Sequence, residues 1–587
     1  MADRRLLLER GLAHQLAGRL AAAEADYRAV LRDDPRDADA LHLLGVLAAA
    51  QADFPAAIDL LRQALAVRPD MPMLHNNLGN ALAKAKQFEA AAASYRRAIE
   101  LAPDYAEAHF NLATALSELK DHLSATIAAR RAVELAPRNA KAAVILGLNL
   151  MEIGRSGEAI AAFRHAQGVR PDIETGRFIL QAIVYDPAQT NASRFAAHRQ
   201  FEADYARAVY PPRREFTNVR DPDRPLRIGW LSSDLREHSI ARNLWPIFER
   251  LDRQRFDMTC YADVARPDHV TAAFRDLSQG WRDIRGRSDG EVADLIRGDR
   301  IDILMLLAGR FDRNRPLVAA HRAAPVQVSL YDAATSGLET MDYLIADSAL
   351  VPRRSTEGFV ERVVRLPSFY TPHAPPDNSP AITAPPCEDS GTVTFGCFSS
   401  PVKISDEVMG LWAAVLQRVP NSRLFLKYAD KLGPQRERLQ AVFARRAIAA
   451  GRLVIGSQWD PPGQHLQLYR DVDVALDPFP FTGSTSTFEA LWMGVPVVTL
   501  LGDAMAGRWS ASMLHTLALG EWIARTPDDY VEIAARLAED RPRLAAWRAQ
   551  LRDRVARSPL CNGALHARRF GRLVRALWRR WCFAPSR

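Results

Sequence analysis

A repeat of 34 residues runs through the first third of this 587-residue chain. Small residues let two helices approach closely, and proline ends a helix, so each unit is predicted to be a pair of helices. The proline column is Pro35, Pro69, Pro103, Pro137 and Pro171. The small-residue columns are Gly11, Gly45, Gly79, Ala113 and Gly147, then Ala23, Ala57, Ala91, Ala125 and Ala159, and finally Ala64, Ala98, Ala132 and Ala166.

This pattern is typical of tetratricopeptide repeats, and it predicts five copies over residues 4–173. Stacked repeats form a superhelix with a concave groove, which favours a protein partner in that groove. Four asparagines lie near inner-helix positions, where their amides either hydrogen-bond an extended peptide or are simply solvated. They are Asn76, Asn77, Asn80 and Asn111.

Composition excludes several classes of protein. With 48% hydrophobic and 25% charged residues, the chain is expected to fold into several domains rather than to be disordered. No apolar stretch reaches the roughly 18 residues of a membrane helix, and charge interrupts the N-terminus before a signal-peptide core. The five cysteines show no CxxC spacing, so neither disulfides nor zinc is predicted. We expect a cytoplasmic protein.

The net charge of +8 permits several kinds of partner without selecting one. Nucleotides, nucleic acid and acidic proteins all attract arginine-rich surfaces. Because no aromatic-basic motif of the usual kinds is present, nucleic acid is not the expected partner.

The remaining residues alternate predicted strands and helices. A helical connector over 174–224 leads to two series of buried strands, which predict two doubly wound α/β domains at 225–370 and 392–556. A proline-rich linker, 371–391, separates them. Ligands in such sheets bind beyond the carboxyl ends of the strands, so a cleft between the domains is the place to look. The strands are expected at 226–233, 256–261, 301–307, 326–331 and 343–346, and at 393–398, 423–428, 453–455, 472–476 and 495–501.

One segment has the chemistry of a phosphate site. A buried strand ends near Asp477, Gly483 and the hydroxyl residues 484–487 follow, and a helix then begins. Free backbone amides, the positive end of the helix dipole and hydroxyl donors together suit phosphate. The alternative is an ordinary helix start, because Ser486 and Glu489 have the spacing of a capping box.

Other polar residues near predicted strand ends have weaker signals. Lys403 either lies against a diphosphate across the cleft or is a surface lysine. His238 and His465 are each compatible with a catalytic, a surface or a core position. Asp471 and Asp473 match a DxD metal motif, but they are expected to open a strand, and no metal is predicted.

Several segments together resemble the O-GlcNAc transferase/SPINDLY family. The most specific is the run Thr487-Phe-Glu-Ala-Leu-Trp-Met-Gly-Val-Pro-Val-Val498. The order of repeat array, connector and two Rossmann-like halves is also that of the family. The resemblance implies a GT-B fold and an inverting glycosyltransferase that needs no metal or other cofactor. Its expected reaction moves a sugar from a nucleotide donor to Ser or Thr of a protein. Further similar segments are 226–238, 325–328, 335–337, 341–343, 508–512 and 558–560.

The resemblance also implies roles for individual residues. Lys403 matches the family's phosphate lysine, and Thr485 and Ser486 match its paired hydroxyls at the helix start, beside Gly483 and Ser484. Glu489 matches the acidic residue that accepts hydrogen bonds from the ribose hydroxyls. His465 matches the histidine beside the base, and His238 a histidine of the acceptor side once proposed as general base.

The chain departs from the family mainly on the acceptor and sugar side. The base-side lysine is Pro462 here, Ser484 replaces a histidine of the animal enzymes, and Ser400 replaces a glutamine. The segments 306–311 and 331–337 also differ from the bacterial pattern, and the first of them introduces Arg310. That guanidinium either pairs with a carboxylate-bearing sugar or points to solvent.

These departures leave the donor open between UDP-GlcNAc and a CMP-nonulosonic acid. The second donor is that of flagellin glycosyltransferases, so flagellin is the protein acceptor that this alternative predicts. Other family transfers are GDP-fucose to Ser/Thr and UDP-glucose to Asn. A scaffold that has lost catalysis is a further alternative, although the retained phosphate residues argue against it.

The C-terminal segment 557–587 contains a basic helix over 568–581 with apolar residues at helical intervals. It either lies on a membrane surface or crosses back to pack on the first α/β domain, which we favour. Nothing in the sequence predicts an oligomeric state.

Overall fold

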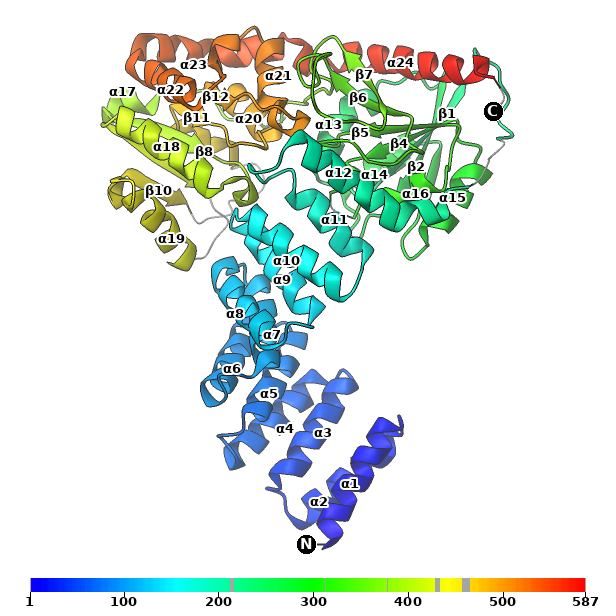
Figure 1. Ribbon diagram of the computed structural model, residues 1–587, viewed down its shortest axis with the longest axis vertical. Coiled ribbons are helices and arrows are strands. Elements are labelled where there is room, and N and C mark those ends of the chain that lie inside the picture. Colours follow the sequence, from blue (N-terminus) through cyan, green and yellow to red (C-terminus); the bar gives the residue numbers. More distant parts are fainter. Residues whose placement is uncertain are drawn as a thin grey trace. The chain divides into compact units, whose positions relative to one another are not determined.

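The computed structural model describes residues 2–211, 216–311, 313–376, 378–427, 433–456 and 465–585. It divides into two compact parts: a repeat array, mainly residues 2–175, and an α/β part, mainly residues 176–585 (Figure 1). The predicted fold class is confirmed: helical repeats precede two parallel-sheet α/β domains.

The array consists of consecutive helix pairs, as the 34-residue period predicts. Each alanine of the column from Ala23 to Ala159 is fully buried. The pairs are α1 (Ala2–Leu16) and α2 (Leu20–Asp33), α3 (Ala38–Ala50) and α4 (Phe54–Val67), α5 (Pro72–Lys84) and α6 (Phe88–Leu101), α7 (Ala106–Glu118) and α8 (His122–Leu135), and α9 (Ala140–Glu152) and α10 (Ser156–Val169).

The small-residue column has a steric reason. A Cβ on Gly79 would lie 2.5 Å from the Tyr95 ring of the next helix, so only glycine admits that ring. In the fourth repeat the corresponding residues are Ala113 and Ala129, which are both small and fully buried. Helix separation is therefore set by matched sizes across each pair.

The asparagines of the array bond mainly to one another and to neighbouring helices. Asn76 is fully buried, donates to Glu107 (3.2 Å) and accepts from Asn111 (3.0 Å). Asn77 contacts His42, and Asn80 accepts from the Tyr95 hydroxyl. For Asn76, both the peptide-binding and the solvated interpretation are wrong, because its amide is buried and hydrogen-bonded within the array.

The first α/β domain holds a seven-stranded parallel sheet in the order β3-β2-β1-β4-β5-β6-β7. Its central strands are buried along their whole length, as expected for a sheet covered on both faces. The strands are β1 (Leu226–Ser232), β2 (Phe256–Ala262), β3 (Gly280–Asp283), β4 (Ile303–Leu307), β5 (Val326–Leu330), β6 (Tyr343–Asp347) and β7 (Arg362–Leu366). The helices before and within this domain are α11 (Ile173–Ala182), α12 (Asn191–Phe201), α13 (Ser239–Phe248), α14 (His269–Leu277), α15 (Asp289–Gly298) and α16 (Leu317–Ala320).

The second α/β domain holds a six-stranded parallel sheet in the order β10-β9-β8-β11-β12-β13. The strands are β8 (Val393–Cys397), β9 (Ser422–Lys427), β10 (Leu453–Gly456), β11 (Val474–Leu476), β12 (Val497–Leu500) and β13 (Ile523–Ala524). The helices are α17 (Pro386–Ser390), α18 (Asp406–Arg418), α19 (Gly433–Ala444), α20 (Thr485–Trp492), α21 (Trp509–Thr516), α22 (Pro527–Glu539), α23 (Arg541–Ala556) and α24 (Gly563–Phe583).

Three strands of these sheets are missing from the expected set: β3, β7 and β13. All three lie at sheet edges, and they are short or only partly buried. An edge strand needs no continuous apolar run, so its sequence lacks the signal that marks the central strands. Tyr428, expected to end a strand, lies outside the described residues.

The C-terminal helix α24 returns to the first α/β domain, as favoured from the sequence. It packs on α13 and lies alongside the strands of that domain (Figure 1). Phe570, Leu577 and Trp578 are buried there, and the Trp578 indole nitrogen donates to Asp221 O (2.9 Å). Among the described residues, no helix has the length and apolar character needed to cross a membrane.

Candidate functional site

A cavity of about 1390 Å³ lies between the two α/β domains. The first domain lines it with helix α13 and the residues before it, including His238 and Arg242. The second domain lines it with Ser399, Ser400 and His465. The structure therefore brings His238 and His465 to one cavity from opposite domains.

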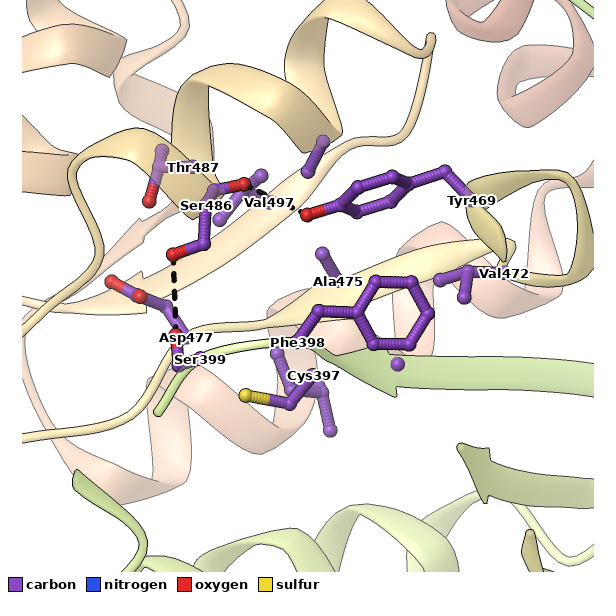
Figure 2. Close-up of a pocket in the computed structure, with 13 residues that line it drawn as sticks. Cys397, Phe398, Ser399, Tyr469, Val472, Ala475, Asp477, Ser486, Thr487 and Val497 are labelled. Carbon is purple, nitrogen blue, oxygen red and sulfur yellow. Dashed lines mark hydrogen bonds between the residues drawn. The ribbon is translucent and has the colours of Figure 1, made fainter. Parts of the chain in front are cut away.

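Helix α20 begins at the edge of the second sheet without a side-chain cap. Its N-cap residue Ser484 has φ −129° and ψ −77°, and no side-chain hydrogen bond closes the first turn. Ser486 Oγ instead lies 3.2 Å from Ser399 Oγ, as Figure 2 shows. The capping-box alternative for Ser486 and Glu489 is wrong, and the first-turn amides are left without that internal acceptor.

The loop before α20 is held by a buried carboxylate. Asp477 follows β11 and accepts from Gly483 N (2.7 Å) and from Thr499 Oγ1 (2.7 Å). Burial raises the pKa of Asp477. A Cβ on Gly483 would collide with Thr487 Oγ1, so glycine is required where the chain folds onto the helix start. Asp477 therefore fixes the path of residues 482–487 at the edge of the sheet.

The ammonium of Lys403 lies beside this loop and not on the surface. Lys403 ends a 3-10 helix, Pro401–Lys403, and its Nζ donates to Thr482 O (2.7 Å). The Phe481 ring centroid lies 4.3 Å from the same Nζ, at cation–π distance. Burial lowers the pKa of Lys403 to about 8, although the nearby Asp477 opposes the shift. The surface-lysine alternative is wrong.

Hydrogen bonds join Lys427, His465 and Glu489 of the second domain to Arg242 of the first. His465 Nε2 lies 2.9 Å from Glu489 Oε2, and Lys427 Nζ lies 3.0 Å from His465 Nδ1. Because an ammonium only donates, His465 Nδ1 accepts and its Nε2 carries the proton toward Glu489. From the first domain, Arg242 Nη2 donates to Glu489 Oε1 (3.3 Å). Both carboxylate oxygens thus have a donor.

His238 is positioned by helix α13. It is the N-cap residue, and its Nδ1 accepts from Ile240 N (3.3 Å). An accepting Nδ1 places the proton of a neutral ring on Nε2. In this tautomer Nε2 carries the hydrogen-bond donor, while the Nδ1 lone pair is engaged by Ile240 N.

Arg310 requires a correction. It is 3% exposed, and its guanidinium donates to Asp332, to His198 Nε2 and to Thr335 O (2.7 Å). Neither the sugar-carboxylate nor the solvent interpretation is supported, because the charge is paired inside the first domain. Burial and the neighbouring Arg310 lower the pKa of His198 to about 3, which keeps that ring a neutral acceptor.

Within the DxD segment, Asp473 has a structural role in the second sheet. Asp473 is buried and accepts from Cys387 N (3.1 Å) and Thr394 N (2.7 Å), just before β11. In the described part of the chain, no group of three or more His, Cys, Asp or Glu is placed to hold a metal ion. Pro462 lies outside the described residues.

Sequence reasoning missed two residues that the fold brings to this site. Arg242 lies one helical turn after His238, and that spacing is the signal by which it could have been found. Lys427 ends strand β9, at the same sheet edge as Lys403. Arg242 contacts Glu489, and Lys427 contacts His465. These partners are far apart in the chain, so a local sequence pattern could not reveal the contacts.

Comparison with known proteins agrees with this architecture. A family model described as "Glycosyl transferase family 41" matches residues 195–373 and 388–570. Tetratricopeptide models match residues 8–72, 79–120 and 106–139.

Two of the relatives are plant proteins. A probable UDP-N-acetylglucosamine–peptide N-acetylglucosaminyltransferase SPINDLY of Solanum lycopersicum is 34% identical over 416 residues, which cover 69% of this chain and 44% of that protein. A probable UDP-N-acetylglucosamine–peptide N-acetylglucosaminyltransferase SEC of Arabidopsis thaliana is 28% identical over 61% of this chain and 37% of its own length. This chain therefore spans less than half of these relatives.

A solved structure matches over nearly the whole length. A mutant of the Thermobaculum terrenum O-GlcNAc transferase superposes with a TM-score of 0.72 and 32% identity, covering 99% of this chain and 98% of that one. With its two matched α/β domains and its repeats, the chain belongs to glycosyl transferase family 41.

Proposed function

We propose that this protein is an inverting protein O-glycosyltransferase of GT-B type. It moves N-acetylglucosamine from UDP-GlcNAc to a Ser or Thr hydroxyl of a protein that the repeat array binds. The observation that carries the proposal is the uncapped start of α20, where Thr485 and Ser486 lie next to a loop that also holds the Lys403 ammonium.

The proposed chemistry uses these groups to stabilise the leaving nucleotide. The acceptor hydroxyl oxygen forms a bond to the anomeric carbon from one face, while the bond from that carbon to the phosphate oxygen breaks on the other. The bonding electrons leave with UDP, and the hydroxyl proton passes to a base. Lys403 and the first-turn amides of α20 neutralise the charge that develops on the phosphate, which is why the proposal needs no metal.

The other residues of the site have supporting roles in this proposal. Glu489 accepts from the ribose hydroxyls, and His465 lies against the base. His238, with its proton on Nε2, donates a hydrogen bond to an oxygen of donor or acceptor and so orients it.

The choice of donor rests on the surroundings of Arg310 and on the names of the relatives. The CMP-nonulosonate alternative drew on Arg310 and on the loss of the base-side lysine at Pro462; the Arg310 guanidinium is paired with Asp332, and Pro462 lies outside the described residues. The relatives' names specify UDP-N-acetylglucosamine. Flagellin remains the protein acceptor that the CMP-nonulosonate alternative predicts.

A thermal-shift screen against UDP-GlcNAc, UDP, GDP, CMP and CDP tests the donor. We expect UDP and UDP-GlcNAc to raise the melting temperature selectively, because a ligand that binds only the folded state stabilises it. A shift with CMP alone would instead support the nonulosonate donor. In a transfer assay with labelled UDP-GlcNAc, Lys403→Ala serves as the inactive control.

A further inference from the structure

The contact between Arg242 and Glu489 crosses the cleft between the two α/β domains. Arg242 lies on α13 of the first domain and Glu489 on α20 of the second, with 3.3 Å between Nη2 and Oε1. Glu489 is only 7% exposed, and its other oxygen faces His465. Arg242 and His465, the two partners of Glu489, both line the cavity.

A nucleotide donor competes for that same oxygen. If ribose hydroxyls donate to Glu489, as proposed above, they approach from the cavity that Arg242 lines. Two donor groups meet at one partly enclosed carboxylate oxygen, so a bound ribose shares or displaces the guanidinium. Among the described residues the Arg242 side chain has one hydrogen bond, the 3.3 Å contact with Glu489, and it is 38% exposed, so displacement costs little.

The phosphates of a bound donor would offer a displaced Arg242 an anionic partner. Ser399 and Ser400 line this cavity, and Ser399 Oγ contacts Ser486 Oγ at the start of α20. That helix start is the proposed phosphate site, one turn before Glu489 along the helix. Guanidinium binds phosphate oxygens in a two-pronged geometry, which a carboxylate oxygen at 3.3 Å does not provide.

We propose that Arg242 is a donor-binding residue: it pairs with Glu489 when the cleft is empty and binds the phosphates of the nucleotide once the ribose occupies Glu489. The first α/β domain thereby contributes a charged contact to the donor. This inference rests on the proposed function, because it takes the ligand to be a nucleotide.

Calorimetric titration of the full chain with uridine, UMP and UDP tests the proposal. The variants are Arg242→Ala, Arg242→Lys and the control Arg250→Ala. Arg250 also lines this cavity and pairs with Glu249, so its removal changes the charge equally. We expect Arg242→Ala to weaken UDP binding about ten- to a hundredfold, since a hydrogen bond to a charged group contributes about 1.5–3 kcal/mol. Uridine binding stays within about twofold or becomes tighter, because the competitor for Glu489 is gone.

The other outcomes separate this proposal from the proposed function. Equal weakening of uridine and UDP by Arg242→Ala, or unchanged UDP binding, overturns the role of Arg242. Arg242→Lys recovers part of the UDP affinity if a charge on the phosphate is what matters. If wild type binds cytidine nucleotides only, the donor class proposed above is wrong, and the ratio of CMP to cytidine affinity decides on Arg242. If wild type binds no nucleotide, both proposals fail.

Discussion

Lys403 is enclosed by the loop that leads to α20, and this enclosure affects its protonation. A buried ammonium loses hydration, so the pKa of Lys403 falls to about 8. The lysine is then charged at neutral pH but loses its charge within the range that an enzyme assay covers. Its proposed role depends on the charged form.

Transfer should therefore fall in alkaline solution. We expect kcat/KM of wild type to decline above about pH 8, as the cationic fraction of Lys403 declines in the free enzyme. Lys403→Arg should lack this decline because a guanidinium stays charged. Lys403→Ala should lose about 10²-fold or more in kcat. A decline that persists unchanged in Lys403→Arg would assign it to another group.

The Arg310–Asp332 pair predicts an effect on stability and not on donor choice. Arg310→Met leaves the Asp332 carboxylate buried without its cation, which should cost about 3–5 kcal/mol of unfolding free energy in urea. The double variant Arg310→Met/Asp332→Asn should recover more than half of that loss. A single variant with full stability and impaired donor binding would restore the sugar-pocket interpretation.

At the scale of elements, the spacing of paired helices in the array depends on glycine opposite an aromatic ring. Gly147 faces Phe163 as Gly79 faces Tyr95, and a Cβ at either glycine would overlap the ring. Gly168, near the end of α10, has open space around the same position. Gly79 is therefore a suitable test position in the array, and Gly168 is its control.

Gly79→Ala should lower the unfolding free energy of the array by about 1–3 kcal/mol, because the ring must shift in a packed interface. Gly168→Ala should raise it by up to about 1 kcal/mol, since alanine favours the helix and meets nothing. Thermal unfolding of the full chain, followed by circular dichroism, measures both. Equal effects of the two substitutions would contradict the steric explanation.

At the scale of the whole molecule, α24 at the end of the chain completes the domain that begins at β1. Trp578 is fully buried, its indole nitrogen bonds to Asp221 O, and the Arg224 guanidinium lies 4.8 Å from its ring. Helix α13, on which α24 packs, carries both His238 and Arg242. The C-terminal helix thus supports one wall of the cavity.

Trp578→Ala should cost about 3–5 kcal/mol of unfolding free energy, the usual loss for a large buried aromatic residue. Arg580→Ala, on the exposed side of the same helix, should stay within about 0.5 kcal/mol. Urea unfolding followed by tryptophan fluorescence distinguishes them. If both variants are as stable as wild type, α24 does not complete the domain.

The sequence by itself determined the features that follow from local pattern. Period and residue size are local properties, so the 34-residue columns predicted the helix pairs, and continuous apolar runs predicted the central strands. The loop from Asp477 to Glu489 was identified as a phosphate site for the same reason, since a strand end, a glycine and hydroxyl residues are contiguous. Edge strands such as β3 lacked this signal.

Only the tertiary structure decided which charges are free to bind a ligand. Arg310 and Lys403 both look available in the sequence, yet one is paired with Asp332 and the other lies against Thr482 O beside the helix start. Its spacing from His238 marks Arg242 in the sequence, but only the fold places Glu489 of the second domain beside it. The physical reason is that pairing and desolvation depend on neighbours distant in the chain, and a one-dimensional pattern does not contain them.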